Sequence, residues 1–355
     1  MSWPVDAVIE RVDKELTAFL TARADVLAQV GPELDPIVAA ARSIVLEGGK
    51  RLRPMFAYWG WRCVHGRDDD DSALVTAAAC LELLHACALV HDDVMDASAT
   101  RRGRPAAHIA FADLHRAARW LGDPEVYGTA AAIVLGDLLM SWADAMFSTA
   151  ALPASVRDET RRVWDDMRQL VMAGQYLDVL VQARGEYSVD DALRVAMFKT
   201  SKYTVEGPLH FGAAAAGAGP ETFAALTAYG LPLGEAFQLR DDVLGVFGDP
   251  DVTGKPAGDD LREGKRTLLV ALAMTRANEE QAALLRARLG DRSLDAVAVA
   301  ELRDVITATG ALADVERRIA TCAAQARAAL RMPAVSADAQ ESLDALVSAA
   351  TERHT

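Results

Sequence analysis

The chain has 355 residues, of which 51% are hydrophobic and 6% aromatic, enough apolar material for a sizeable buried core. Its formal net charge of −14 excludes a general attraction for polyanions and argues against nucleic-acid binding, which normally requires a basic surface. Alanine-rich stretches such as residues 213–218 and 323–329 favour helix, and alternating strand patterns are scarce. We therefore predict an all-α fold in which residues 1–355 form one domain.

The amino terminus lacks the pattern of a targeting segment. Residues 1–6 contain neither the basic start nor the apolar run of a signal peptide. The four cysteines show no CxxC spacing and suit a reducing compartment. We expect a cytoplasmic protein without stable membrane insertion, because the long apolar stretch before residue 92 contains Glu82 and His85.

The first cationic element is a glycine-containing segment from Gly48 to Pro54. Glycine lets backbone N–H groups approach an anion closely, so the segment is typical of a phosphate site. It is not a Walker loop, because Lys50 is followed by Arg51 instead of Ser or Thr and the leading glycine spacing is missing.

The first acidic cluster, Asp92-Asp93-Val94-Met95-Asp96, follows an almost wholly apolar run at residues 73–90. Residues four apart share a helix face, so Asp92 and Asp96 project together and repel one another. A divalent cation would relieve that repulsion, and an all-oxygen ligand set indicates Mg²⁺ with a phosphorylated ligand. For a single cluster of this kind, a solvated helix end is the alternative interpretation.

Further cations follow the first cluster, and a second acidic cluster is placed among them. The cations are Arg101, Arg102, Arg104, Lys199, Lys202, Lys255, Lys265 and Arg266. The second cluster, Asp241-Asp242, again lies in an apolar helical run at residues 237–249. Each cation alone is typical of surface charge, but together with two acidic clusters they favour a site for a diphosphate and metal ions.

In this order the motifs resemble those of the trans-isoprenyl diphosphate synthases, the polyprenyl synthetase family, and among these the bacterial geranylgeranyl diphosphate synthases. The matching pieces are Gly49 to Pro54, Asp92 to Asp96, Arg101 to Gly103, Gly136-Asp137, Gly174-Gln175 with Asp178, Lys199-Thr200, Phe237-Gln238 with Asp241-Asp242, and Gly254-Lys255. The resemblance covers most of the chain. It implies an isoprenoid synthase-type helical bundle around a deep central cavity, usually a homodimer, with the two Asp-rich helices facing each other across the cavity mouth.

The resemblance also implies roles for single residues. Three Mg²⁺ per active site would be held by Asp92, Asp93, Asp96, Asp241 and Asp242. The allylic diphosphate would be contacted by Arg101, Lys199, Lys255 and Lys265. Isopentenyl diphosphate would be bound by Lys50, Arg53, His85 and Arg102, although His85 also fits a satisfied core histidine. Oxygens facing the developing allylic cation would come from Gln175, Thr200 and Gln238.

The implied reaction is head-to-tail condensation of isopentenyl diphosphate with a dimethylallyl, geranyl or farnesyl diphosphate, begun by Mg-assisted ionisation of the allylic C–O bond. One position departs from the family pattern. Gly245 stands where many relatives carry a third Asp in the second motif. This departure puts in question a ligand at that position but leaves Asp241 and Asp242 in place.

Product length is predicted from the helix that precedes Asp92. Cys87 and Ala88 occupy positions where fifteen-carbon synthases often place aromatic side chains, and both are small here. A growing chain would pass them and reach the layer near Leu84. The twenty-carbon product, geranylgeranyl diphosphate, is therefore favoured, with a farnesyl or longer polyprenyl product as the alternative.

Three other classes of protein share parts of this pattern. A class I terpene cyclase uses an Asp-rich helix and Mg²⁺, but its usual Asn, Ser or Thr, and Glu motif is absent around Asp241. A noncatalytic modulatory subunit commonly loses one Asp-rich motif, whereas both remain here, and activity of the purified chain alone would decide. A di-iron bundle needs a second Glu-x-x-His pair besides Glu82 and His85.

Overall fold

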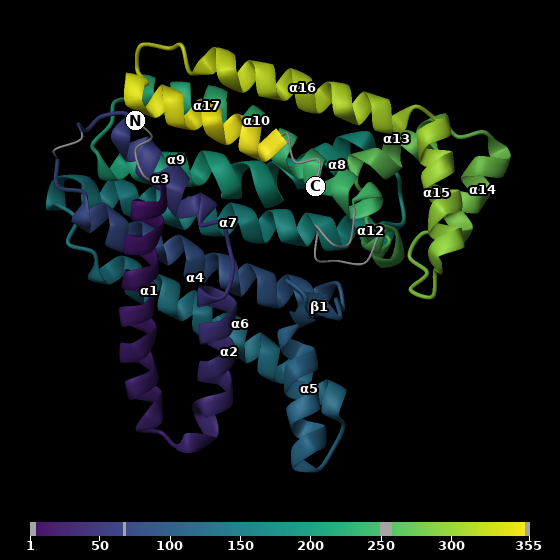
Figure 1. Cartoon of the computed structure of the whole chain (residues 1–355), viewed down its shortest axis with the longest axis horizontal. Helices are drawn as coiled ribbons and strands as arrows, with labels where there is room; N and C mark the ends of the chain where they lie inside the picture. Colours follow the sequence, from purple (N-terminus) through teal and green to yellow (C-terminus); the bar gives the residue numbers. More distant parts are fainter. Residues whose placement is uncertain (1–4, 67–68, 249–257, 352–355) are drawn as a thin grey trace.

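The structure, a computed structural model, describes residues 5–66, 69–248 and 258–351. Several long helices lie roughly along the long axis of the molecule, and other helices, including the first one of the chain, run across them (Figure 1). The helices up to residue 149 are α1 (Val5–Ala28), the short 3-10 helix η1 (Pro32–Leu34), α2 (Asp35–Leu46), α3 (Leu52–Arg62), α4 (Ser72–Met95), α5 (Ala107–Ala118) and α6 (Pro124–Thr149).

The remaining helices form the other half of the bundle and a flank beyond it. They are α7 (Ala154–Arg184), α8 (Val189–Val195), the π-helix η2 (Ala196–Glu206), α9 (Gly207–Ala215), α10 (Pro220–Phe247), α12 (Asp259–Glu263), α13 (Leu268–Arg276), α14 (Glu279–Arg288), α15 (Ala296–Ala308), α16 (Ala311–Ala329) and α17 (Ala337–Thr351). The strands in the described ranges are β1 (Thr100–Arg101) and β2 (Arg104–Pro105), which pair as one small antiparallel hairpin. The all-α prediction is confirmed.

Local sequence signals mark where several helices begin and end. The carboxylate of Asp123 caps α6 by accepting the backbone N–H groups of Glu125 and Val126, and Pro124 occupies the first turn, where no N–H is needed. Helix α7 ends at Gly185, whose φ of 69° is readily adopted by a residue without a side chain. These signals fix where α6 begins and where α7 ends.

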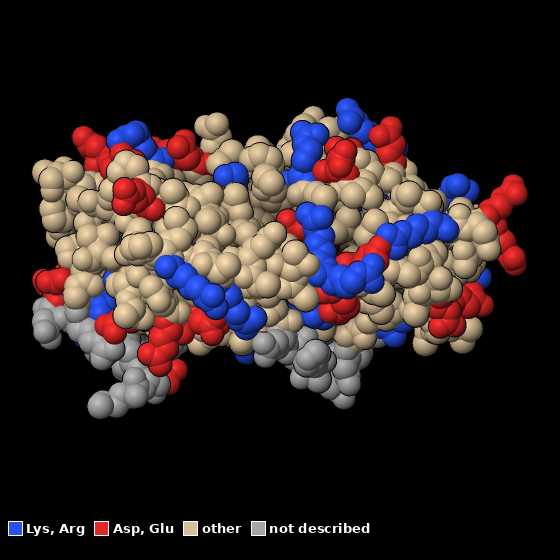
Figure 2. Space-filling view, turned by 90° about the horizontal axis from the view of Figure 1, so that it is seen from above, with Lys and Arg blue, Asp and Glu red and all other residues tan. Residues whose placement is uncertain are grey.

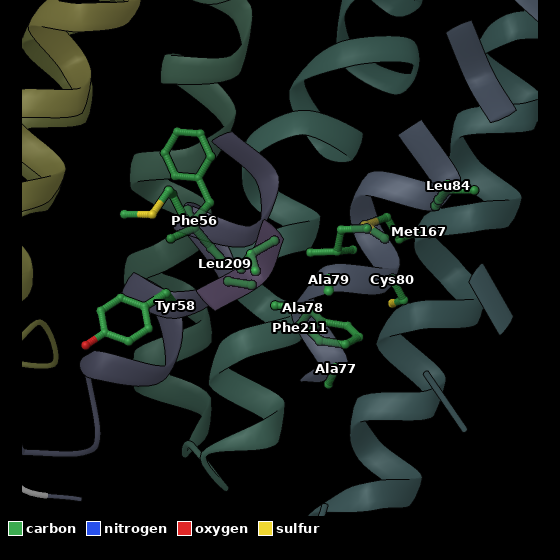
Figure 3. Close-up of a cluster of buried hydrophobic side chains, with 14 of the residues drawn as sticks. Phe56, Tyr58, Ala77, Ala78, Ala79, Cys80, Leu84, Met167, Leu209 and Phe211 are labelled. Atoms are coloured by element: carbon green, nitrogen blue, oxygen red, sulfur yellow. The ribbon is translucent and has the colours of Figure 1, made fainter. Parts of the chain in front are cut away.

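Helix α4 lies at the centre of the larger hydrophobic core and packs most extensively against α6. Its buried residues include the small side chains Ala77, Ala78 and Ala79, which allow neighbouring helices to approach closely; Figure 3 shows them within a cluster of buried side chains. Helices α3 and α9 also approach closely: a Cβ on Gly212 would lie 1.7 Å from the carbonyl oxygen of Ala57. Backbone contact of this kind fixes the positions of the helices around the site.

A second hydrophobic cluster joins α10 to α13, α15 and α16. On the side of the molecule formed by α16, basic and acidic side chains are interspersed with broad uncharged areas (Figure 2). Arg318, for example, pairs with Glu235, and Arg317 pairs with Asp314. The visible face therefore lacks the single-sign basic surface that nucleic-acid binding requires.

Two helices are long and apolar enough to cross a membrane by length and composition, α4 and α6. The apolar window of α4 is 72% buried inside the protein, as expected of a core helix, whereas that of α6 is 44% buried. More than half of the α6 window is therefore half-buried or exposed in this single chain.

Candidate active site

A cavity of about 630 Å³ lies between α3, α4, α7, η2, α10 and α12. It brings together most of the residues that the sequence predicted for the site. Those that line it are Lys50, Arg53, His85, Ala88, Asp92, Arg101, Arg102, Gln175, Lys199, Thr200, Gln238, Asp241, Asp242 and Lys265. Residues of the two acidic clusters and predicted cationic residues, which are separated widely in sequence, thus line one cavity.

Four predicted residues do not line this cavity. Asp93 and Asp96 are buried beside it, and Leu84 lies in the packed core. Cys87 is also buried, and its Sγ lies 3.8 Å from Nδ1 of His91, which in turn contacts Ile133 of α6. Lys255 lies outside the described residues.

Asp92 is held at the cavity wall by groups from two other helices. Its Oδ1 accepts hydrogen bonds from Lys199 Nζ and from Gln175 Nε2, each at 2.9 Å, and Arg101 Nη2 lies 3.9 Å from its Oδ2. Burial alone would raise the pKa of Asp92, but the charge of Lys199 and the neighbouring cations outweighs it and lowers the pKa to about 2. This carboxylate is therefore ionised at neutral pH.

The neighbouring Asp93 points to the small hairpin instead of the cavity. Its carboxylate is 1% exposed and accepts Arg101 Nε at 3.0 Å. The hairpin turn at Arg102 and Gly103 has positive φ at both positions, 53° and 73°, as a two-residue turn of this type requires. It directs Arg102 in the opposite direction, where Nη1 donates to the backbone carbonyls of Glu47 and Gly48.

Asp96 ends α4 and is paired with a cation from the segment after α12. Lys265 Nζ lies 3.5 Å from Asp96 Oδ2, 3.6 Å from Asp260 and 2.9 Å from Glu263. Burial and the nearby charge of Asp92 raise the pKa of Asp96 to about 6. A cation added beside this carboxylate would stabilise its charged form and lower its pKa.

The second acidic cluster is more deeply buried than the first. Asp242 accepts a hydrogen bond from Gln238 Nε2 at 2.6 Å, and the Gln238 side-chain oxygen accepts the hydroxyl of Thr200. Burial, together with the charges of Asp260 and Asp241, raises the pKa of Asp242 to about 8. The two hydrogen bonds from Thr200 to Gln238 and from Gln238 to Asp242 thus connect the π-helix to the second acidic cluster.

Gly245, the departure from the family pattern, has a physical reason in the structure. A Cβ at this position would lie 2.0 Å from Oδ2 of Asp260 and 2.4 Å from its Cγ. The space that a third Asp side chain of α10 would need is therefore taken by a carboxylate from α12. Asp260 lines the cavity, so an acidic group is present there although the motif lacks one.

The π-helix η2 places several site residues on one side of the cavity. Its wider turns are rare and are found mostly at functional sites. Lys199 reaches both Asp92 and, at 2.7 Å, Asp178 of α7. A Cβ on Gly174 would lie 2.4 Å from the Lys199 backbone nitrogen, so glycine is needed for this close approach of the two helices.

A separate cationic group lies at the α3 side of the cavity. Arg53 donates to Thr204 at 2.8 Å and stacks over the Tyr203 ring at 4.4 Å, but its Nε has no hydrogen-bond partner. His85 Nδ1 is likewise buried without a partner, and burial plus the charge of Arg53 lowers the His85 pKa well below its usual value. Unpartnered donors of this kind are suited to an anion.

Two further arginines line the cavity, Arg51 from the first cationic element and Arg266 from the predicted set of cations. Arg51 is 4% exposed and pairs with Glu82, 2.9 Å away and equally buried. Arg266 stacks over Tyr187 at 4.2 Å, and its Nε and Nη1 have no hydrogen-bond partner. The apolar context of Glu82 was a signal for a buried partner, whereas the position of Arg266 depends on a loop contact that the sequence does not reveal.

The donor set of this cavity is suited to a hard divalent cation. Within residues 5–66, 69–248 and 258–351, no three His, Cys, Asp or Glu side chains are already grouped to hold a metal ion. Mg²⁺ usually binds through one or two carboxylates together with substrate phosphates, so carboxylates on facing helices fit it when a diphosphate lies between them.

Comparison with known proteins agrees with this geometry. Residues 35–306 match the family described as polyprenyl synthetase. The chain belongs to the polyprenyl synthetase family. Its members are trans-prenyltransferases that bind isoprenyl diphosphates and depend on magnesium, and this chain is an enzyme of that class.

Relatives in the polyprenyl synthetase family make products of more than one length. A geranylgeranyl pyrophosphate synthase from Corynebacterium glutamicum, solved with isoprenyl diphosphate and magnesium, is 42% identical with a TM-score of 0.96, covering 99% of this chain and 100% of that one. The geranylgeranyl diphosphate synthase of Mycobacterium tuberculosis is 38% identical over 67% of this chain and 63% of its own. The geranylfarnesyl diphosphate synthase of Aeropyrum pernix is 33% identical over 90% and 95%, respectively.

Proposed function

We propose that this chain condenses isopentenyl diphosphate head to tail with allylic diphosphates and releases geranylgeranyl diphosphate as its main product. The observation that carries the proposal is the shared cavity, in which acidic clusters on α4 and α10 lie together with two cationic groups, as a site for two diphosphates and their metal ions would require. The names of the relatives from Corynebacterium glutamicum and Mycobacterium tuberculosis support the twenty-carbon length.

The allylic diphosphate is assigned to the end of the cavity near the acidic clusters. There Lys199, Arg101 and Lys265 face the space between α4 and α10 and would offset the negative charge that develops as the C–O bond breaks. We add Arg266 to this group because its two unpartnered donors lie at the same end. Lys255 remains a predicted contact from outside the described residues.

Isopentenyl diphosphate is assigned to the cationic group formed by Lys50, Arg53, His85 and Arg102. The unpartnered Arg53 Nε and His85 Nδ1 would donate to its phosphate oxygens. Holding the alkene beside the allylic carbon makes the condensation effectively intramolecular, which lowers the barrier without any new chemistry. The hydroxyl of Thr200 and the side chains of Gln175 and Gln238 line the space between the two diphosphates.

Magnesium is assigned to Asp92 and Asp96 on α4 and to Asp241 and Asp242 on α10, with three ions per site. When bound, these ions would neutralise the departing diphosphate as Lewis acids. Asp93 was predicted as a further ligand, but its contact with Arg101 supports a second task, which is to aim that guanidinium at the allylic diphosphate. Asp260 supplies the acidic group that Gly245 omits.

The twenty-carbon product is supported by the wall of the cavity below Asp92. Ala88, one turn before Asp92, lines the cavity with a single methyl group, so a growing chain passes it. The layer below contains Leu84, which is buried in the core.

We further propose that the enzyme acts as a cytoplasmic homodimer whose whole chain forms one domain. Apolar side chains on α6 and α7 face outward in the single chain: Ile133 is 44% and Val134 56% exposed, and Met172, Tyr176 and Val179 form a matching stripe on α7. A second copy would cover such a surface. The cavity wall is built from helices as far apart in sequence as α3 and α12, which supports a single functional domain.

The central test is incubation of the purified chain with Mg²⁺, labelled isopentenyl diphosphate and each of the five-, ten- and fifteen-carbon primers, followed by product chromatography. Asp92→Asn and Asp241→Asn should each lower turnover by about 10²- to 10³-fold, as loss of a group that stabilises transition-state charge typically does. Asp113→Asn, at an exposed carboxylate of α5, is the control and should retain activity. Near-native turnover in both active-site variants contradicts the proposed site, and activity only on adding a second synthase would favour a modulatory subunit.

A further inference from the structure

The register of α7 against its neighbours defines how deep each residue lies below the diphosphate end of the cavity. Asp178 contacts Lys199 near the mouth, and Gly174 touches the Lys199 backbone just below. Deeper still, a Cβ on Gly207 would lie 2.9 Å from both Cγ and Sδ of Met167. Helix α7 therefore runs antiparallel to η2 and α9, and Met167 lies deeper than Gly174.

The same depth scale applies to α4. Asp92 contacts Gln175 at the mouth, whereas Cys80, three turns earlier, lies within electrostatic range of Arg168. The two helices therefore run in the same direction, and Leu84 of α4 and Met167 of α7 belong to the same hydrophobic core cluster. Figure 3 shows both side chains in one buried cluster.

On the α7 side the cavity ends immediately above Met167. Its lining on α7 stops at Val171, one turn above Met167, and its lining on η2 stops at Thr204, about one turn before Gly207. On α4 the lining continues to His85 and Glu82, on the side of the cationic group. Met167 is 3% exposed and Leu84 1% exposed. Because Gly207 has no side chain, the thioether of Met167 fills the space between α7 and α9 that would otherwise continue the cavity downward.

We propose that Met167, packed on Gly207, closes the floor of the hydrocarbon channel and sets the length at which chain growth stops. This inference rests on the proposed function and names a residue that decides its product length. One helical turn is about 5.4 Å deep, close to the length of one five-carbon unit. Shortening Met167 should therefore admit one more unit, whereas a larger side chain should exclude one.

The experiment is chromatography of the products made from labelled isopentenyl diphosphate and dimethylallyl diphosphate, a five-carbon primer from which products shorter and longer than twenty carbons can both form. Met167→Ala should shift the main product upward by one five-carbon unit, and Met167→Val, which leaves a smaller void, should shift part of it. Met167→Phe keeps the core filled and should shift the distribution toward shorter products. The double variant Ala88→Phe with Met167→Ala should stay short, because residue 88 blocks the channel above the floor.

Leu302→Ala is the control for general destabilisation, since Leu302 is fully buried in the separate cluster around α15. It should lower the melting temperature without changing product length. The inference is overturned if the Met167 variants give the wild-type distribution, or if the double variant makes the longer product. Failure of the proposed function would look different, because the wild-type chain would then make no product or a product of a length other than twenty carbons. The difference in product length between wild type and variant reports on Met167 whatever length the wild type makes.

Discussion

Replacing Gly245 by alanine tests whether Asp260 occupies the place of the missing third Asp. In an open helical position the change would stabilise the protein by about 1 kcal/mol, because alanine loses less backbone freedom than glycine. Here the new Cβ would lie 2.0 Å from a carboxylate oxygen and 2.4 Å from its carbon. Overpacking of this kind costs about 1–3 kcal/mol, so we expect a net loss of up to about 2 kcal/mol.

The sign of the effect should reverse once the carboxylate is removed. In an Asp260→Ala background the steric conflict disappears, and Gly245→Ala should then stabilise the protein by about 1 kcal/mol. The predicted coupling between the two positions is therefore about 1–3 kcal/mol. It is measured by urea denaturation of the metal-free wild type, both single variants and the double variant.

A parallel cycle with Asp259→Ala is the matched control, because Asp259 is the adjacent carboxylate of α12, whereas the three atoms nearest to a Cβ on Gly245 all belong to Asp260. Its coupling to Gly245→Ala should be markedly smaller. Equal effects of Gly245→Ala in the presence and absence of the Asp260 side chain would refute the idea that this glycine exists to admit that carboxylate.

Three further predictions follow from the charges and surfaces of the molecule. Burial and the charge of Asp260 raise the pKa of Asp242 to about 8, above the unfolded value of about 3.9. The protonated Asp242 side chain therefore favours folding at low pH, and this contribution to stability is lost as pH rises toward 8. Asp242→Asn should make the melting temperature of the metal-free protein depend less on pH between these two values, and an unchanged dependence would contradict the assignment. Arg266→Gln should weaken pyrophosphate binding in calorimetry by about tenfold, since a hydrogen bond to a charged group contributes about 1.5–3 kcal/mol; an equal affinity would place Arg266 outside the site. Ile133→Glu should shift the enzyme toward monomer in sedimentation velocity, whereas Val297→Glu, at a 67% exposed valine of α15, should not.

Much of the site could be predicted from sequence because its chemistry is written in short motifs on helices. Spacing of four residues placed Asp92 and Asp96 at the same end of α4, and apolar runs identified both acidic helices as core elements. The fold class followed from alanine-rich stretches and scarce strand patterns. Most of the predicted cationic residues line one cavity, although Arg104 and Lys202 do not, and the sequence alone could not say which carboxylate each one contacts.

The parts that sequence could not supply depend on side-chain direction and on long-range packing. Cys87 and Ala88 are adjacent, and adjacent helical residues point about 100° apart, so only Ala88 shares the cavity face with Asp92 while Cys87 turns toward His91. The sequence alone also could not predict that the Asp260 carboxylate of α12 takes the place of a third Asp on α10. That prediction requires knowing that residues 245 and 260 meet, and no local pattern encodes that contact.

The ion pairs of the site also indicate how it is kept folded before substrates arrive. Asp92 is neutralised by Lys199, Asp93 by Arg101 and Asp96 by Lys265, so no acidic side chain of the first cluster is left buried and unpaired. A diphosphate brought in with its metal ions offers these cations new partners and offers the carboxylates new cations. Each buried charge therefore exchanges one partner of opposite sign for another, and substrate binding need not leave any of these charges unpaired. Rearrangement of existing pairs, more than creation of new ones, is the step that the proposed assignment of Lys199 and Arg101 predicts.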